Sequence, residues 1–435
     1  MMCNKYKFRL SLLLFSVFII FLFLFINGCG TTPIVDNSIP SPSSTTIITP
    51  TLFTPNISPS ATPTSIPDVP TTDSSEAVTP KPATPQPTSK SARVVMVGDM
   101  LMHDGVINSG KSDNGYNFDH LFSNVFTEIN TADLAIVNQE VIIAGTQFGI
   151  SGYPYFNSPL ELCDSIVKAG FDIVLNASNH TLDKGKDAML FSLSHWRNNF
   201  PQVGILGMHD SKQDREKIHL VEINDITFAI LNYTYGVNGS GKAALAENPY
   251  LVDVLEESRV RSDIIRAEAM ADITIVTVHW GTEYSHVPSE TQREWADLFL
   301  DNGVDLVLGT HPHVIQPIEW LTREDGHKML VYWSLGNFVN CTSGRGTGKG
   351  ARMLGAMSDV TFIKDKNGAT YIDKAVAHSL ITHIDYAQYG ITTYFFKEYN
   401  ESMFLKNQAI TFDSTFSYQF CIDTFNTILG DYLVK

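Results

Sequence analysis

The chain has 435 residues with 46 acidic and 30 basic side chains, which gives a formal net charge of −16. An acidic balance of this size argues against a nucleic-acid partner, because nucleic-acid-binding proteins carry basic patches. The length exceeds that of one ordinary domain, so the composition along the chain decides how it is divided.

The first 28 residues have the pattern of a secretory signal. Three basic residues precede an apolar run from Leu10 to Ile26, which is followed by "NGCG". This ending is similar to a bacterial lipobox, so we expect residues 1–28 to be removed and Cys29 to carry the lipid. The alternative is an uncleaved anchor, because the run approaches the roughly 17–25 residues of a spanning helix. Both interpretations place the rest of the chain on the extracytoplasmic face of the cell membrane.

Residues 29–90 consist largely of Thr, Ser and Pro, as in "SPSATPTSIPDVP". Such a segment cannot bury enough apolar surface to offset the entropy lost on ordering. Its proline content favours a semi-extended chain of about 3 Å per residue. We therefore predict a disordered stalk, in preference to a structured all-β segment, that holds a globular domain of residues 91–435 away from the membrane.

Residues 91–435 alternate buried-strand patterns with amphipathic helical patterns. Strands are expected at 92–99, 134–140, 171–180, 273–280, 304–311 and 327–338, and helices at 118–133, 158–170, 187–198 and 289–303. Strands that are nearly continuous in Val, Ile and Leu and alternate with helices predict an α/β fold with a largely parallel sheet covered on both faces. Residues 218–235 and 355–380 alternate and turn at Asn-Asp or Asn-Gly, which predicts antiparallel hairpins.

Polar residues follow these strands one after another. In open α/β sheets, ligands bind beyond the carboxyl ends of the strands, so we expect the following residues to share one edge: Asp99, Glu140, Asn179, His180, His279, His311, His313 and Asn337.

This mixed set of oxygen and nitrogen donors suits Mn, Fe or Zn, as one ion or two. A divalent ion makes water acidic enough to attack near neutral pH. The expected ligands are Asp99, Glu140, Asn179, His279, His311 and His313. His180 would then act as the proton donor, oriented by Asp183. Each residue also has an ordinary structural explanation, such as a helix cap for Asp99, a turn for Asn179 or a buried core position for His279.

The segment "NCTSGRGTGKGARM" (340–353) lacks the spacing of a phosphate-binding P-loop. One interpretation is a plain flexible loop beside the site. The functional interpretation is that Arg345, Lys349 and Arg352 gather an anionic substrate, together with Asn337.

Six motifs in this order resemble the CapA family of poly-γ-glutamate capsule synthesis proteins over residues 92–339: "VGDMLMHDGV", "NQE", "NASNHTLDKG", "VHWGTEY", "GTHPHVIQPIE" and "YWSLGNFV". That family is similar to the calcineurin-like metallophosphatases. The resemblance implies a two-layered αββα sandwich in which the ligand set above follows successive strands.

The resemblance is incomplete at three places. The phosphatase Asp-x-His upstream of Gly98-Asp99 is missing, and Glu140 stands where that superfamily has an aspartate motif. Thr310 stands where many family members have a further histidine. Because of these departures, we expect either a centre with one metal ion or a second metal site that binds its ion weakly.

Together, these features predict a membrane-tethered, extracytoplasmic, metal-dependent hydrolase or transferase that acts on an anionic cell-envelope polymer or its anchoring bond. The family resemblance implies a part in the synthesis or export of poly-γ-glutamate or another capsule polymer. The first alternative is a non-catalytic scaffold that holds polymer and contacts membrane synthase subunits. The second is a substrate-binding lipoprotein of a transporter, which leaves the strand-end motifs unexplained.

Overall fold

The computed structural model describes residues 89–435 except 240, 343 and 387–389. These residues belong to the compact unit Pro82–Lys435. The expected signal segment, Cys29 and residues 29–88 of the expected stalk lie outside the described residues, whereas Lys90, the last residue of that stalk, begins the first strand. Within the described part of the chain, no helix is both long and apolar enough to cross a membrane.

The first sheet has the strand order β16-β15-β14-β1-β4-β5-β6, and β13 also pairs with β1. Its parallel strands are β1 (Lys90–Met100), β4 (Leu134–Asn138), β5 (Ile173–Leu175), β6 (Gly204–Leu206) and β13 (Asn337–Val339). Its antiparallel strands are β14 (Leu354–Lys364), β15 (Thr370–Asp385) and β16 (Gly390–Phe395).

The second sheet has the strand order β11-β12-β10-β9-β8-β7. Its parallel strands are β8 (Ile226–Thr234), β9 (Ile273–His279), β10 (Leu306–Thr310) and β12 (Lys328–Tyr332), with β7 (His219–Ile223) and β11 (Ile318–Thr322) antiparallel at the edges. The predicted hairpins are present as β7–β8, which turns at Asn224 and Asp225 with φ of 51° and 64°, and as β14–β15. A separate small hairpin joins β2 (Lys111–Ser112) to β3 (Gly115–Tyr116).

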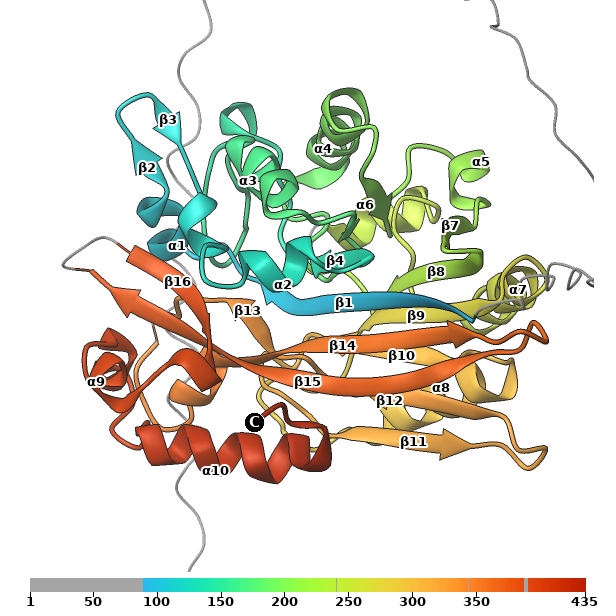
Figure 1. Cartoon of the computed structure of the whole chain (residues 1–435). Helices are drawn as coiled ribbons and strands as arrows, with labels where there is room; N and C mark the ends of the chain where they lie inside the picture. The colour runs from blue at the N-terminus through green and yellow to red at the C-terminus, as the bar shows by residue number, and fades with distance from the viewer. Residues whose placement is uncertain (1–88, 240, 343, 387–389) are drawn as a thin grey trace, which may run out of the picture. The chain divides into compact units, whose positions relative to one another are not determined.

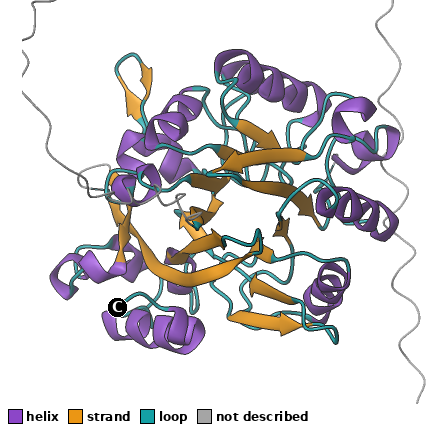
Figure 2. Cartoon of the chain, turned by 45° about the vertical axis from the view of Figure 1, so that its right-hand side comes forward, coloured by secondary structure: helices purple, strands orange, loops and turns teal. Residues whose placement is uncertain are grey.

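The two sheets pack face to face. Phe228 of β8 contacts Phe362 of β14 with 5.1 Å between ring centroids, and one hydrophobic core contains residues of both sheets. A second core lies between the second sheet and α7 and α8, on the sheet's other face. Figures 1 and 2 show the strands in the middle and helices at the periphery. The helices are α1 (Asp104–Ser109), α2 (Phe126–Asn130), α3 (Glu161–Ala169), α4 (Gly185–Asn199), α5 (Lys212–Arg215), α6 (Gly241–Glu247), α7 (Glu257–Glu268), α8 (Glu290–Asp301), α9 (Glu401–Phe404) and α10 (Tyr418–Leu429).

The mixed α/β class is therefore confirmed, and the two packed sheets agree with the two-layered arrangement that the family resemblance implied. The single, largely parallel sheet that the strand pattern alone predicted is wrong. Strands such as β4 and β9 are buried at every residue. A continuous apolar run indicates that both faces are covered, but it does not tell whether a helix or a second sheet covers each face. Here the second sheet covers one face of the first.

Local signals placed most of the predicted helices correctly. Helix α8 starts with a capping box between Ser289 and Gln292, and α3 ends at Gly170, which has a φ of 98°. The helix expected over 118–133 is instead broken into a 3-10 turn and the short α2. In the break, Asn124 donates hydrogen bonds to Thr392 and Thr393 of β16, a tertiary contact that the periodicity could not reveal.

Candidate metal centre

The candidate ligands lie where strands of both sheets end close together. In the first sheet, Asp99 of β1 pairs with Asn138 of β4 and with Asn337 of β13. In the second sheet, His279 of β9 pairs with Thr310 of β10. Because β1 also contacts β8 and β10 across the interface, these carboxyl ends meet at one end of the two-sheet core.

Asp99 ties the first sheet to the histidine segment after β10. Its Oδ1 accepts a hydrogen bond of 2.7 Å from Asn138 Nδ2, and its Oδ2 accepts one of 3.1 Å from the backbone N–H of His311. The same Oδ2 lies 3.4 Å from Nδ1 of His313. One carboxylate therefore orients the first of the two histidines and lies beside the imidazole of the second.

Glu140 provides the test of whether the residues fit a metal ion. Its side chain is fully buried, and neither carboxylate oxygen has a hydrogen-bond partner among the described residues. Its Oε1 lies 3.7, 3.8 and 4.0 Å from the Nε2 atoms of His279, His313 and His180. A buried carboxylate without partners is costly, whereas a cation between these donor atoms would satisfy it. The donor set therefore fits a divalent ion.

His279 lies at the centre of the remaining donors. Its Nε2 is 2.8 Å from Oδ1 of Asn179 and 3.2 Å from Nδ1 of His311. On the other side of the ring, Nδ1 is 3.1 Å from the hydroxyl of Thr310, which is itself 3.4 Å from the carbonyl oxygen of Val278. A hydroxyl that accepts from Nδ1 and donates to a carbonyl leaves the lone pair on Nε2, facing the other ligands.

The backbone of the histidine segment is strained. His311 and His313 have φ values of 97° and 58°, a region that non-glycine residues seldom adopt, at a cost of about 1–3 kcal/mol each. The segment is held by Tyr284, whose N–H donates to the carbonyl of Pro312 (2.7 Å), and by Asn337, whose Nδ2 donates to the carbonyl of His313 (3.2 Å). Strain that the surroundings impose in this way is typical of a functional site.

Glu283 is a candidate ligand that the sequence reasoning missed. Its carboxylate groups with His311 and His313, with all potential ligand atoms within 4.8 Å of one another, while Asp99, Glu140 and His313 form a second such group. His313 therefore belongs to both groups. The signal was available in "HWGTEY", because Glu283 follows the end of β9 by four residues.

His180 and Asp183 lie together as expected. Nδ1 of His180 is 2.7 Å from Oδ2 of Asp183, and the same oxygen accepts a hydrogen bond of 2.8 Å from the backbone N–H of Phe156. Phe156 also packs edge-on against the His180 ring. With Nδ1 engaged in this way, Nε2 is the free nitrogen that faces Glu140.

The pKa values separate the groups of the cluster that hold a proton from those that do not. Burial raises the pKa of Glu140 well above its usual value. Burial also disfavours protonated His313, but the attraction of Glu140 and Asp99 outweighs it and raises the pKa of His313 to about 9. Burial and the neighbouring imidazoles lower the pKa of His311 to about 3 and that of His279 well below its usual value. His279 and His311 are therefore neutral, the form that binds metal.

The four residues expected to contact substrate have different surroundings. Asn337 is buried, and its Oδ1 lies 3.1 Å from Nδ1 of His313, so its amide is used within the protein and positions that histidine. Arg345 is exposed. Lys349 and Arg352 both lie over one tyrosine ring close to the cluster.

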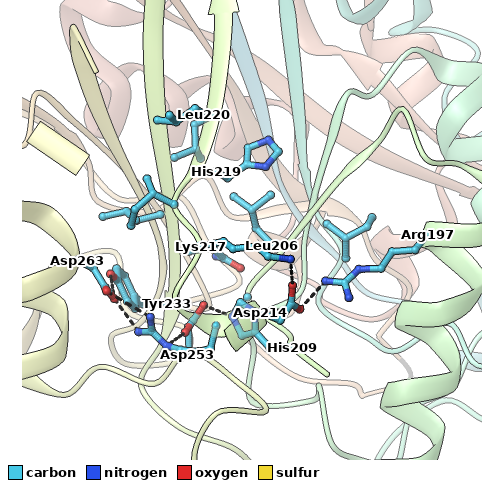
Figure 3. A pocket seen from close by; sticks show the side chains of 17 residues that line it. Arg197, Leu206, His209, Asp214, Lys217, His219, Leu220, Tyr233, Asp253 and Asp263 are labelled. Carbon is cyan, nitrogen blue, oxygen red and sulfur yellow. Dashed lines mark hydrogen bonds and ion pairs between the residues drawn. The ribbon is translucent and has the colours of Figure 1, made fainter. Parts of the chain in front are cut away.

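A cavity of about 620 Å³ lies elsewhere, lined by residues of β6, α5, β7 and β8 (Figure 3). Its floor is an ionic network in which Arg215 contacts Asp253 and Asp263 at 2.6 Å each. His209 lies 2.7 Å from Asp253. Because these charges are matched within the protein, we interpret the network as structural.

The family described as bacterial capsule synthesis protein PGA_cap matches residues 93–342, which include every candidate ligand. The PGA biosynthesis protein CapA of Bacillus subtilis (strain 168) is 34% identical over 170 residues, 39% of this chain and 42% of that protein. The capsule biosynthesis protein CapA of Bacillus anthracis is 26% identical over 254 residues, 57% and 59% of the two chains. The chain thus spans about half the length of these relatives.

Solved structures with partial similarity include three enzymes. They are the Haemophilus influenzae NAD nucleotidase (TM-score 0.41, 10% identity, 80% of this chain and 64% of that chain), the Thermus thermophilus sulfate thiohydrolase SoxB (0.38, 11%, 66% and 56%) and a purple acid phosphatase from yellow lupin seeds (0.34, 9%, 66% and 53%).

Proposed function

Because the chain belongs to the family of bacterial capsule synthesis proteins, we propose that it is a metal-dependent hydrolase of the metallophosphatase type that acts in the synthesis or export of poly-γ-glutamate or a related anionic capsule polymer. The observation that carries this proposal is Glu140. A fully buried carboxylate without hydrogen-bond partners faces three imidazole nitrogens at 3.7–4.0 Å, an arrangement that a divalent cation stabilises.

The ligands of the proposed ion are Asp99, Glu140, Asn179, His279, His311, His313 and the newly identified Glu283. Mn, Fe or Zn would suit such a mixed set of imidazole, carboxylate and amide donors, as one ion or as two. When bound, such an ion acts as a Lewis acid towards a phosphoryl or carbonyl oxygen and makes water more acidic.

The protein's own residues supply orientation and proton transfer. Asp183 accepts from Nδ1 of His180 and so presents the other ring nitrogen, Nε2, to the cluster. This geometry suits His180 as the group that donates a proton to the departing oxygen or nitrogen of the substrate. Thr310 and Asn337 hold His279 and His313 in their orientations.

We further propose that lipid on Cys29 anchors the protein to the extracytoplasmic face of the cell membrane and that it works there with membrane synthase subunits. The support is the signal-like beginning of the chain and the Thr, Ser and Pro composition of residues 29–90. Labelling with a radioactive fatty acid, lost on Cys29→Ala, tests this part separately from the chemistry.

The chemistry is tested by metal content and turnover in the same preparations. We expect stoichiometric Mn, Fe or Zn after mild purification, lost in His279→Ala and His311→Ala but kept in the control His195→Ala, which removes a histidine from α4. Turnover is measured with a phosphodiester and with a γ-glutamyl polymer. Two results together would refute the hydrolase and favour a non-catalytic scaffold. The purified, metal-loaded protein would turn over neither substrate, and cells that carry His180→Ala would still form a capsule.

A further inference from the structure

Two cations share one tyrosine ring beside the metal centre. The guanidinium carbon of Arg352 lies 3.4 Å from the ring centroid of Tyr284, and the ammonium of Lys349 lies 5.9 Å from the same centroid. Both distances are within the range of cation–π attraction. Two positive charges are thus held near each other on one aromatic platform.

This platform is tied to the histidine segment by two separate routes. The N–H of Tyr284 donates to the carbonyl of Pro312 at 2.7 Å, and its ring centroid lies 6.0 Å from that of His313. Asn337 forms the second route. Its Nδ2 donates to the backbone carbonyl of Arg352 at 2.9 Å, and its Oδ1 lies 3.1 Å from Nδ1 of His313. The backbones of Tyr284 and Arg352 are therefore both anchored to the segment that contains His313.

Neither cation is neutralised within the protein. Among the described residues, no carboxylate forms an ion pair with Arg352 or Lys349, and Nε of Arg352 is buried without an acceptor. The contrast is Arg215, whose guanidinium nitrogens lie 2.6 Å from carboxylate oxygens of both Asp253 and Asp263. A half-buried guanidinium without a counter-ion leaves hydrogen-bonding capacity for an anion from outside.

The carboxylate that acts on Arg352, Glu283, belongs to a candidate metal-binding group. Glu283 attracts Arg352 only at longer range, and its carboxylate groups with His311 and His313 as a candidate metal ligand. Burial lowers the pKa of Lys349, and the positive charge of Arg352 lowers it further, which shows that the two cations repel each other. An anion placed between them would relieve that repulsion.

We propose that Arg352, held on Tyr284 and assisted by Lys349, binds an anionic group of the substrate, a carboxylate or a phosphate, beside the metal centre. The planar guanidinium offers two parallel N–H donors that match either group, and the ring beneath it keeps that plane in place. Substrates with a negative charge near the reacting bond are thereby selected. This inference rests on the proposed function only in taking the metal centre as the place of reaction.

The test measures binding without turnover. The full chain in detergent is stripped of metal with a chelator and titrated in a calorimeter with inorganic phosphate and, separately, with a γ-linked tetraglutamate. The variants are Arg352→Gln, Arg352→Lys and Tyr284→Leu. The control Lys366→Gln removes an exposed positive charge at the β14–β15 turn, about 30 Å along β1 from Asp99.

Arg352→Gln is expected to weaken binding of at least one ligand about ten- to a hundredfold, the range for hydrogen bonds to a charged group. Tyr284→Leu keeps both charges and is expected to weaken binding about two- to fivefold. Arg352→Lys is expected to lie between wild type and Arg352→Gln. Loss for phosphate alone identifies a phosphate group, and loss for tetraglutamate alone identifies a carboxylate.

Unchanged affinity for both ligands in Arg352→Gln overturns the inference. An equal loss of affinity in Arg352→Gln and Lys366→Gln also overturns it, because binding would then depend only on the protein's net charge. Stoichiometric metal uptake by Arg352→Gln shows that the variant is folded. The two proposals can fail separately. If the wild-type protein shows no turnover but Arg352→Gln weakens anion binding, only the hydrolase is refuted. If the wild-type protein shows turnover but Arg352→Gln leaves anion binding unchanged, only the anion site is refuted.

Discussion

Thr310→Val tests the orientation of His279 with a small change in shape. Valine keeps the β-branched outline within β10 but replaces the hydroxyl, which lies 3.1 Å from Nδ1 of His279, with a methyl group. The His279 side chain has no exposed surface, so water cannot take the place of that hydroxyl. The next oxygen, Oδ1 of Asp99, is 3.6 Å from Nδ1 and therefore too distant for a good hydrogen bond.

The expected cost follows from these contacts. Leaving a buried donor without its acceptor costs about 1–3 kcal/mol. Each 1.4 kcal/mol corresponds to about a tenfold change in an equilibrium constant. If this cost falls on the tautomer of His279 that binds metal, the affinity of the protein for the metal ion weakens about ten- to a hundredfold. Losses of this size are typical for residues that orient a metal-binding histidine.

The assay is competition for Zn²⁺ or Mn²⁺ between the protein and a fluorescent chelator at neutral pH. Thr361→Val is the matched control, because it makes the same exchange on β14 opposite Arg93, six residues before Asp99. Wild-type metal affinity in Thr310→Val would refute the reasoning, since either His279 is not a ligand or its orientation does not depend on Thr310. A loss of equal size in Thr361→Val would show an indirect effect on stability.

Three further predictions concern proton transfer, pH and packing. His180→Gln is expected to lower turnover by roughly 10²–10⁴ with metal content unchanged; loss of metal together with activity would instead make His180 a ligand. Burial disfavours protonated His209, but Asp253 and a neighbouring aspartate raise its pKa to about 9 from 6.5, so the protonated form stabilises the fold below pH 6.5 by up to about 3 kcal/mol. This contribution is lost between pH 6.5 and 9, and denaturant unfolding of His209→Gln is expected to lack that part of the pH dependence seen in wild type. Gly98→Ala would place a Cβ 1.9 Å from the carbonyl oxygen of Gly336, so we expect the free energy of unfolding, measured in urea, to fall by about 3 kcal/mol, the upper end of the usual cost of overpacking. Wild-type stability would show that β1 moves aside at no cost.

Several elements follow from local sequence alone. The capping box at Ser289 and the left-handed Gly170 mark real helix ends, and the Asn-Asp turn of the β7–β8 hairpin has the positive φ values that such turns need. The helix expected over 118–133 failed because Asn124 is bonded to β16, about 270 residues further along the chain. Local periodicity reports which faces are apolar but not which distant strand competes for a side chain.

The site shows the same division between local and long-range information. The sequence by itself determined that Asp99, Glu140, Asn179, His279, His311 and His313 follow successive strands, because each strand end is a local pattern. The strand pattern alone did not distinguish one sheet from two, and only the tertiary structure decided which of these residues contact one another across the two sheets. It joins Asp99 to His311 across 212 residues, and Asn179 to His279 across 100.

The tertiary structure also assigned surroundings that no spacing reveals. It placed Glu283 with the histidines, set Thr310 against His279, and left Arg352 without a counter-ion on Tyr284. Such relations depend on which atoms meet after the sheets have packed and on which charges then remain unmatched. Sequence patterns specify the types of residue and their order, whereas distances and burial arise from long-range packing, and these determine which groups bind.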